Sequence, residues 1–132
     1  MELPFEVEVS DDLLHIKHPP GHLITPESAV KNWAYIGELC HKHGCRKVLV
    51  EAHNPRRQLD TIHAFESGRS LAESLKGLMI AMCFVGYEFD ELSDFFKTVA
   101  QNRGATVEFF TDVDEASKWL GVKTGEMAAE PR

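Results

Sequence analysis

Histidine and arginine side chains gather in two polar segments of the first half of the chain, and each segment directly follows an apolar run. Imidazole and guanidinium groups bind anions through charge-assisted hydrogen bonds, and the N-terminus of a following helix adds backbone donors. The candidate side chains are His18, His22, His53, Arg56 and Arg57, with Tyr87 from a third segment. These residue types predict a rim that holds a small anion or contacts a partner, although solvated polar loops would contain the same residues.

The sequence evidence for a catalytic site is weaker than the evidence for this rim. His53 or His63 could act as a general base, but neither has a nucleophile or carboxylate partner at a meaningful spacing. The chain lacks the G-x-S-x-G, P-loop, G-x-G-x-x-G and H-E-x-x-H motifs. Cys83 lies inside an apolar run, which predicts a buried core thiol rather than a nucleophile. We therefore expect no catalytic residue.

A metal site is not expected either. The densest cluster of ligand-type residues is the segment 40–45, with the sequence Cys-His-Lys-His-Gly-Cys, and its spacing matches no tetrahedral zinc pattern. His15 and His18 fall on opposite faces of a predicted strand, so they cannot easily share one ion. The sequence thus predicts neither a metal nor a cofactor.

The elements that must position the rim follow from hydrophobic periodicity. Residues 5–9 alternate in polarity and residues 13–17 form a second predicted strand. The short connection between them predicts an antiparallel hairpin. After it, helical patterns alternate with apolar runs. The predicted elements are a helix from Pro26 to the cap Gly44, a strand at 47–50, a helix at 59–75 kinked or divided at Gly68, a strand at 78–84, a helix at 88–103, a strand at 106–110, and a short helix that begins at Asp112 and ends at Leu120.

This order predicts an α/β fold with a mixed, mostly parallel five-stranded sheet, an N-terminal β-hairpin and about four helices. Ligands of such sheets lie outside the carboxyl ends of the strands, where the candidate rim is expected. The predicted buried face of the first helix comprises Val30, Trp33, Ala34, Gly37 and Cys40. Tyr35 and Leu39 would then lie on its outer side, where they are either isolated surface residues or a contact between subunits.

The amino-acid composition narrows the classes of partner that the chain is expected to bind. The chain of 132 residues has 14 Lys and Arg against 21 Asp and Glu, a net charge of −7, which argues against nucleic acid and anionic membrane surfaces. Its length suits one domain, expected at 1–122 with a flexible tail at 123–132. No apolar run approaches the length of a membrane span. The three cysteines suggest no disulfide framework and a reducing, cytoplasmic location.

The second half of the chain carries a recognisable pattern. Residues 90–96 read Asp-Glu-Leu-Ser-Asp-Phe-Phe, residues 99–104 read Val-Ala-Gln-Asn-Arg-Gly, and residues 107–112 and 115–120 continue it. Together they resemble the SpoIIAA-like branch of the STAS superfamily, the anti-sigma-factor-antagonist-like domains. The resemblance implies a mixed sheet with packed helices and a bacterial-type signalling role. Signalling members carry a phosphorylatable serine in an Asp-Ser-Ser-Gly setting, to which Asp60-Thr61-Ile62-His63 is nearest, so Thr61 is the candidate phosphoacceptor.

Three functions follow as hypotheses. The first is a non-enzymatic regulatory or interaction domain that binds a protein partner or a second copy of itself. The second is a binding domain for a small anionic or lipid-like ligand, held between the helices and the sheet. The third is an enzyme with a histidine base. A pocket between the helices and the sheet would favour the second hypothesis over the first.

Overall fold

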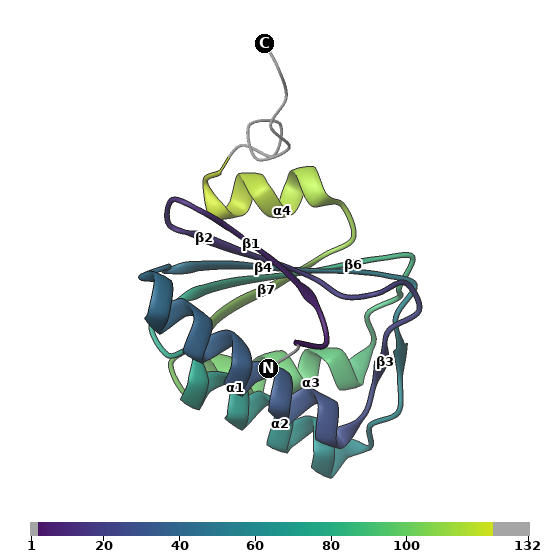
Figure 1. The fold of residues 1–132 in the computed structure, drawn as a ribbon. Coiled ribbons are helices and arrows are strands. Elements are labelled where there is room, and N and C mark those ends of the chain that lie inside the picture. Colours follow the sequence, from purple (N-terminus) through teal and green to yellow (C-terminus); the bar gives the residue numbers. More distant parts are fainter. Residues whose placement is uncertain (1–2, 123–132) are drawn as a thin grey trace.

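A five-stranded sheet forms the centre of the computed structural model, which describes residues 3–122 (Figure 1). The strands are β1 (Glu6–Ser10), β2 (Leu13–Lys17), β4 (Lys47–His53), β6 (Met79–Val85) and β7 (Thr106–Phe110), in the order β1-β2-β4-β6-β7. The β1–β2 pair is antiparallel and every other pair is parallel. The predicted mixed, mostly parallel sheet with an N-terminal hairpin is therefore confirmed. The predicted flexible tail at 123–132 lies outside the described residues.

Four helices cover the two faces of this sheet unequally. The helices α1 (Pro26–His43), α2 (Thr61–Ser74) and α3 (Glu91–Asn102) lie on one face, and α4 (Val113–Leu120) lies on the other (Figure 1). Side chains alternate along each strand, so each face has its own apolar core. Within residues 3–122, no helix is both long and apolar enough to cross a membrane.

Helix α1 begins and ends as predicted but presents a different face to the core. The Thr25 side chain accepts a hydrogen bond from the Ser28 amide at 3.1 Å, and Gly44 ends the helix with a φ of 68°. The buried residues are Ala29, Asn32, Trp33, Ile36 and Cys40.

The predicted buried face was therefore wrong at Val30 and Ala34, which are exposed. Tyr35 and Leu39 are half-buried and pack against the core, so they do not form the outward-facing contact surface that the sequence suggested. The difference arises because α1 packs against both the sheet and α2, and this wide contact turns the helix toward its Tyr35 side. Gly37 marks the contact with α2, since a Cβ there would lie 2.8 Å from the Ser74 carbonyl oxygen.

Helix α2 is continuous through Gly68, which corrects the predicted kink or division. Gly68 is buried where α2 crosses α3, and a Cβ at this position would lie 2.8 Å from the carbonyl oxygen of Phe96 and 3.1 Å from Val99 Cβ. The glycine thus allows two helices to approach closely instead of breaking one of them.

Replacing Gly68 by alanine is expected to lower the free energy of unfolding by about 2 kcal/mol, because the added methyl group overpacks the contact between α2 and α3. In an open helix the same change would raise stability by about 1 kcal/mol. Urea unfolding measures the difference, with Ser70→Ala in the same helix as the control for propensity. A Gly68→Ala protein that is more stable than the wild type would contradict this role.

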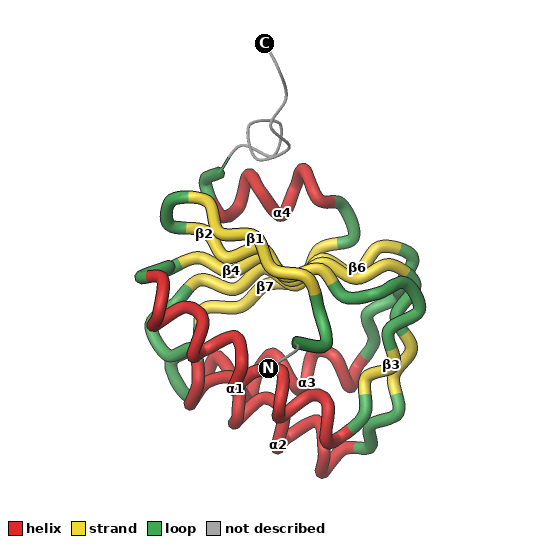
Figure 2. The backbone as a smooth tube through the Cα atoms, viewed as in Figure 1, coloured by secondary structure: helices red, strands yellow, loops and turns green. Residues whose placement is uncertain are grey.

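Two short strands were not predicted. The strands β3 (Leu23–Ile24) and β5 (Arg56–Arg57) pair in parallel and form a ribbon that is separate from the main sheet. Each strand is too short to show alternation. Because β3 leads into α1 and β5 leads into α2, the ribbon stands between the carboxyl edge of the sheet and the N-terminal ends of both helices (Figure 2).

Helix α3 begins later than predicted. Its N-cap is Asp90, whose side chain accepts a hydrogen bond from the Ser93 amide at 3.0 Å, so Glu88 lies in the preceding loop rather than in the first turn. The loop is set by Gly86, whose φ of 78° turns the chain away from β6. This shift makes Asp90 both a helix cap and a member of the candidate site.

Candidate functional site

A pocket of about 80 Å³ lies between the sheet and the helices α1, α2 and α3. Its walls are mostly apolar, and the ribbon of β3 and β5 contributes Ile24 and Arg57 to one side. The large apolar side chains in the walls are Ile36, Val50, Leu59, Met82, Phe84, Phe89, Leu92, Phe96 and Phe109. The pocket is partly open, so the side chains of this protein do not fully cover its apolar walls.

Four of the six predicted rim residues, His18, His22, Arg57 and Tyr87, line this pocket. They come from the segments that follow β2 and β6 and from the ribbon, so the carboxyl edge of the sheet brings them together.

The two histidines of this group form a stacked pair. The ring centroids of His18 and His22 lie 4.0 Å apart with an interplanar angle of 6°, and Phe5 contacts His18 edge-on at 5.5 Å. Burial, and secondarily the neighbouring His22, lower the pKa of His18 to about 3. Burial also lowers the pKa of His22. This side of the rim is therefore uncharged near neutral pH, so these two imidazoles do not offer an anion the charge-assisted hydrogen bonds that their residue type suggested.

His18 also carries an unsatisfied polar atom. Its Nδ1 is buried and has no hydrogen-bond partner within residues 3–122. A buried nitrogen of this kind costs about 1–3 kcal/mol unless a partner reaches it. The fold thus leaves one polar atom of this histidine unsatisfied.

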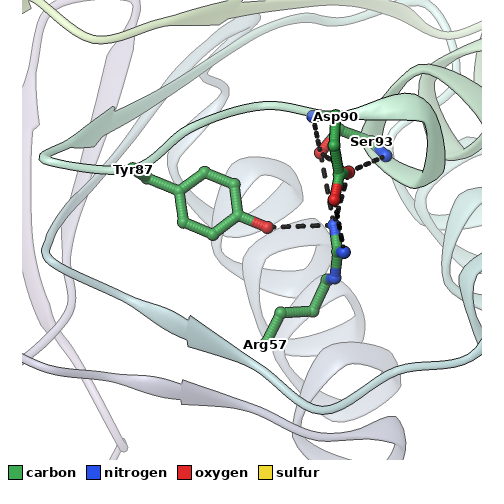
Figure 3. Close-up of polar contacts among 4 residues, drawn as sticks. All are labelled: Arg57, Tyr87, Asp90 and Ser93. Atoms are coloured by element: carbon green, nitrogen blue, oxygen red, sulfur yellow. Dashed lines mark hydrogen bonds and ion pairs between the residues drawn. The ribbon is translucent and has the colours of Figure 1, made fainter.

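Arg57 lies at the centre of a polar cluster (Figure 3). Its guanidinium forms a two-pronged ion pair with Asp90, with Nη1 donating to Oδ1 at 2.9 Å and Nη2 donating to Oδ2 at 2.7 Å. Nη1 also donates to the Tyr87 hydroxyl at 3.0 Å and lies 3.4 Å from Ser93 Oγ. The side chain of Arg57 is only 23% exposed.

This cluster joins the ribbon to the first turn of α3, because Arg57 belongs to β5 and Asp90 caps the helix. The Arg57 guanidinium, helped by the Ser93 amide, holds the pKa of Asp90 well below its usual range. The positive charge of Arg57 is thus matched by a full negative charge beside it.

Polar residues that sequence reasoning missed lie deeper in the pocket. Asn32 is 7% exposed and lines the pocket, and its side-chain amide makes no hydrogen bond within residues 3–122. Trp33 Nε1 donates to the Ser67 hydroxyl oxygen at 3.1 Å, and both residues line the pocket. The signal in the sequence was an asparagine at helical spacing from Ala29 and Ile36, inside the apolar stripe of α1.

The other candidates lie apart from the pocket. His53 occupies the end of β4, and strand alternation directs it to the α4 face together with Glu51. Glu51 Oε1 lies 2.8 Å from His15 Nε2, and Glu51 Oε2 lies 2.7 Å from His53 Nε2. A base at His53 would therefore not reach a molecule held in the pocket.

Arg56 is exposed on the ribbon, and Thr61 is exposed at the first position of α2. Beside Thr61, Nδ1 of His63 lies 2.7 Å from Oδ1 of Asp60. Burial is the main cause that raises the pKa of the Cys83 thiol, to about 12, in keeping with a core thiol. No group of three His, Cys, Asp or Glu side chains in the described part of the chain is placed to hold a metal ion.

Comparison with known proteins does not extend these observations. The sequence matches no protein-family model and none of the curated proteins with which it was compared. The resemblance of residues 78–120 to SpoIIAA-like domains therefore stays a prediction. What can be said of function depends on the chemistry of the pocket within an α/β fold.

Proposed function

We propose that this protein is a binding domain that holds a small, mostly apolar molecule in the pocket between the sheet and helices α1, α2 and α3. The carrying observation is Asn32, a residue that is 7% exposed on a wall of large apolar side chains. Its side-chain amide has no hydrogen bond within residues 3–122, and the amide is not fully enclosed, because the only fully buried unpaired side-chain atom in this part of the chain is Nδ1 of His18. Buried polar groups are normally paired, and a leucine here would avoid the desolvation cost. A ligand that forms a hydrogen bond with this amide would explain why an asparagine stands at this position.

The shape of the site supports this reading. Ligand pockets are typically apolar, with a few convergent polar groups that orient the ligand. The apolar walls lie between the sheet and the helices, and the polar groups of His18, Arg57 and Tyr87 come from the carboxyl edge of the sheet. A bound molecule would bury its apolar part among the aromatic side chains and turn its polar part toward these groups.

We further propose that the described residues adopt the SpoIIAA-like version of this fold, on the strength of the element order and the motif in the second half. A regulatory or interaction role is compatible with ligand binding, because a domain can report its occupancy to a partner. Thr61 remains the candidate phosphoacceptor, and its exposure at the start of α2 leaves its hydroxyl accessible.

The chain offers a built-in reporter for the test. It has two tryptophans, of which Trp33 lines the pocket and Trp119 lies in α4 on the other face of the sheet. The Trp119→Phe protein therefore reports on the pocket through Trp33 alone. Titration with toluene and with hexan-1-ol is expected to change its fluorescence in a saturable way. If neither compound produces a saturable change, the proposed function is wrong.

A matched pair of substitutions on α1 tests the location. Ala29 lines the pocket, so Ala29→Leu in the Trp119→Phe background is expected to weaken binding of toluene at least about tenfold by filling the space. Ala34→Leu adds the same atoms on the exposed side of the helix and should leave binding unchanged. Equal binding by both variants would place the ligand elsewhere.

A further inference from the structure

The proposed function leaves the chemical class of the ligand open. We propose, building on that function, that the pocket selects an uncharged molecule with an apolar body and a hydrogen-bonding group such as a hydroxyl or a primary amide, and that it discriminates against carboxylates of the same size. The inference rests on two observations. Arg57, the charged side chain that lines the pocket, is paired with Asp90, and the lining side chains that keep unpaired polar groups are neutral.

The only formally charged side chain that lines the pocket within residues 3–122 is Arg57. An anionic ligand would need its guanidinium, but both terminal nitrogens already donate to the Asp90 carboxylate at 2.9 and 2.7 Å. Asp90 is held in turn by the amide of Ser93 at 3.0 Å and by its hydroxyl at 3.1 Å. A ligand carboxylate at this place would face the carboxylate of Asp90 and would be repelled.

The histidine pair does not supply the missing charge. The imidazoles of His18 and His22 stack at 4.0 Å, so a proton on one would be opposed by a proton on the other. Burial holds the pKa of His18 at about 3 and lowers the pKa of His22, so both rings are neutral near neutral pH. A neutral imidazole offers one donor and one acceptor, and these suit a hydroxyl or an amide.

The side chains that line the pocket and keep unpaired polar atoms are neutral as well. They are His18, through its Nδ1, and Asn32, through its amide, and neither group has a hydrogen-bond partner within residues 3–122. The Ser67 hydroxyl accepts from Trp33, which leaves its own hydrogen for donation. A site built from unpaired neutral groups favours a ligand that satisfies them, because an apolar ligand would leave them buried and unbonded.

The test compares three probes with the same six-carbon chain: hexan-1-ol, hexanoate and hexane. Each is titrated into the Trp119→Phe protein near neutral pH, and Trp33 fluorescence gives the dissociation constant. Hexan-1-ol is expected to bind at least about tenfold more tightly than hexanoate, and more tightly than hexane. Equal or tighter binding of hexanoate overturns this inference while leaving the proposed function in place. Absence of binding by all three overturns this inference, and the proposed function is wrong as well if toluene also fails to bind.

Two helix-cap variants test the origin of the selectivity. Asp90→Asn keeps the cap of α3, since asparagine caps as well as aspartate, but releases the charge of Arg57. Its affinity for hexanoate is expected to rise at least about tenfold. Asp60→Asn makes the same change at the cap of α2, away from the pocket, and should leave hexanoate affinity unchanged. An unchanged affinity in Asp90→Asn would show that the ion pair does not exclude anions.

Asn32→Leu separates a ligand-binding role from a structural one. Because the side chain of Asn32 forms no hydrogen bond within residues 3–122, leucine at this position is expected to raise Tm while removing most of the preference for hexan-1-ol over hexane. A variant that lowers Tm and keeps the preference would assign Asn32 to the fold and would overturn its role in recognition.

Discussion

Replacing Trp33 by alanine is expected to lower the free energy of unfolding by about 4 kcal/mol, the largest effect anticipated for a single substitution here. Trp33 is 6% exposed, and its ring stacks on Phe96 with centroids 6.2 Å apart. Its indole N–H donates to Ser67 at 3.1 Å, which ties α1 to α2. Alanine would remove all of these contacts and enlarge a space that is already incompletely filled.

Urea unfolding followed by circular dichroism measures this loss without relying on the deleted fluorophore. Trp33→Phe serves as the control, because it keeps an aromatic ring against Phe96 while it loses the hydrogen bond to Ser67 and part of the indole ring, at an expected cost of about 1–2 kcal/mol. If Trp33→Ala lowers the free energy of unfolding by less than Trp33→Phe does, the packing between α1 and α3 does not depend on the ring of Trp33.

The second large effect concerns the carboxylate that bridges two histidines on the other face of the sheet. Glu51→Gln is expected to lower the free energy of unfolding by about 3 kcal/mol near neutral pH. Hydrogen bonding from His15, with a further bond from His53, lowers the pKa of Glu51 from its ordinary value of 4.5 to about 2, although burial opposes the shift. Glutamine keeps the shape of the side chain and removes the charge.

The pH dependence of this effect has a defined sign. Because the pKa of Glu51 is lower in the folded chain than in the unfolded chain, its carboxylate contributes stability fully above pH 4.5, and that contribution is lost as the pH falls through about 2. The difference between wild type and Glu51→Gln should therefore narrow over this interval. Urea midpoints measured across it would show the convergence, and a constant gap would contradict it.

A second glutamate gives the comparison for an exposed pair. Glu108 lies 2.9 Å from Lys97 Nζ, and its side chain is 37% exposed. Glu108→Gln removes the same charge and is expected to cost less than about 1 kcal/mol. A similar loss in both variants would mean that the charge of the whole chain, rather than the bridge between His15 and His53, sets the effect.

The main elements of the fold could be predicted from sequence because their signals are local. The caps Thr25 and Gly44 determine the ends of α1, and the continuous apolar runs of β4 and β6 indicate strands covered on both faces. The predictions were wrong where contacts between helices, rather than local sequence, determine the role of a residue. Gly68 was interpreted by its low helix propensity, whereas its role is set by the Phe96 carbonyl oxygen of another helix.

The site could be predicted only in part for a related reason. Loop position brought His18, His22, Arg57 and Tyr87 into the prediction, since residues after parallel strands meet at one edge. Charge was predicted less well, because the pairing of Arg57 with Asp90 spans 33 residues and no local pattern encodes it. Asn32 was missed because the sequence does not show which side chains surround a polar residue inside an apolar stripe.

Adjacent residues of strand β4 have unrelated roles on opposite faces of the sheet. Val50 forms part of the pocket wall, and the next residue, Glu51, is hydrogen-bonded to His15 and His53 on the opposite face. One peptide bond thus separates a mostly apolar pocket from a carboxylate that is hydrogen-bonded to two histidines. A substitution at Val50 would change the shape of the pocket, whereas a substitution at Glu51 would change the stability in acid. The two properties can therefore be varied independently on a single seven-residue strand.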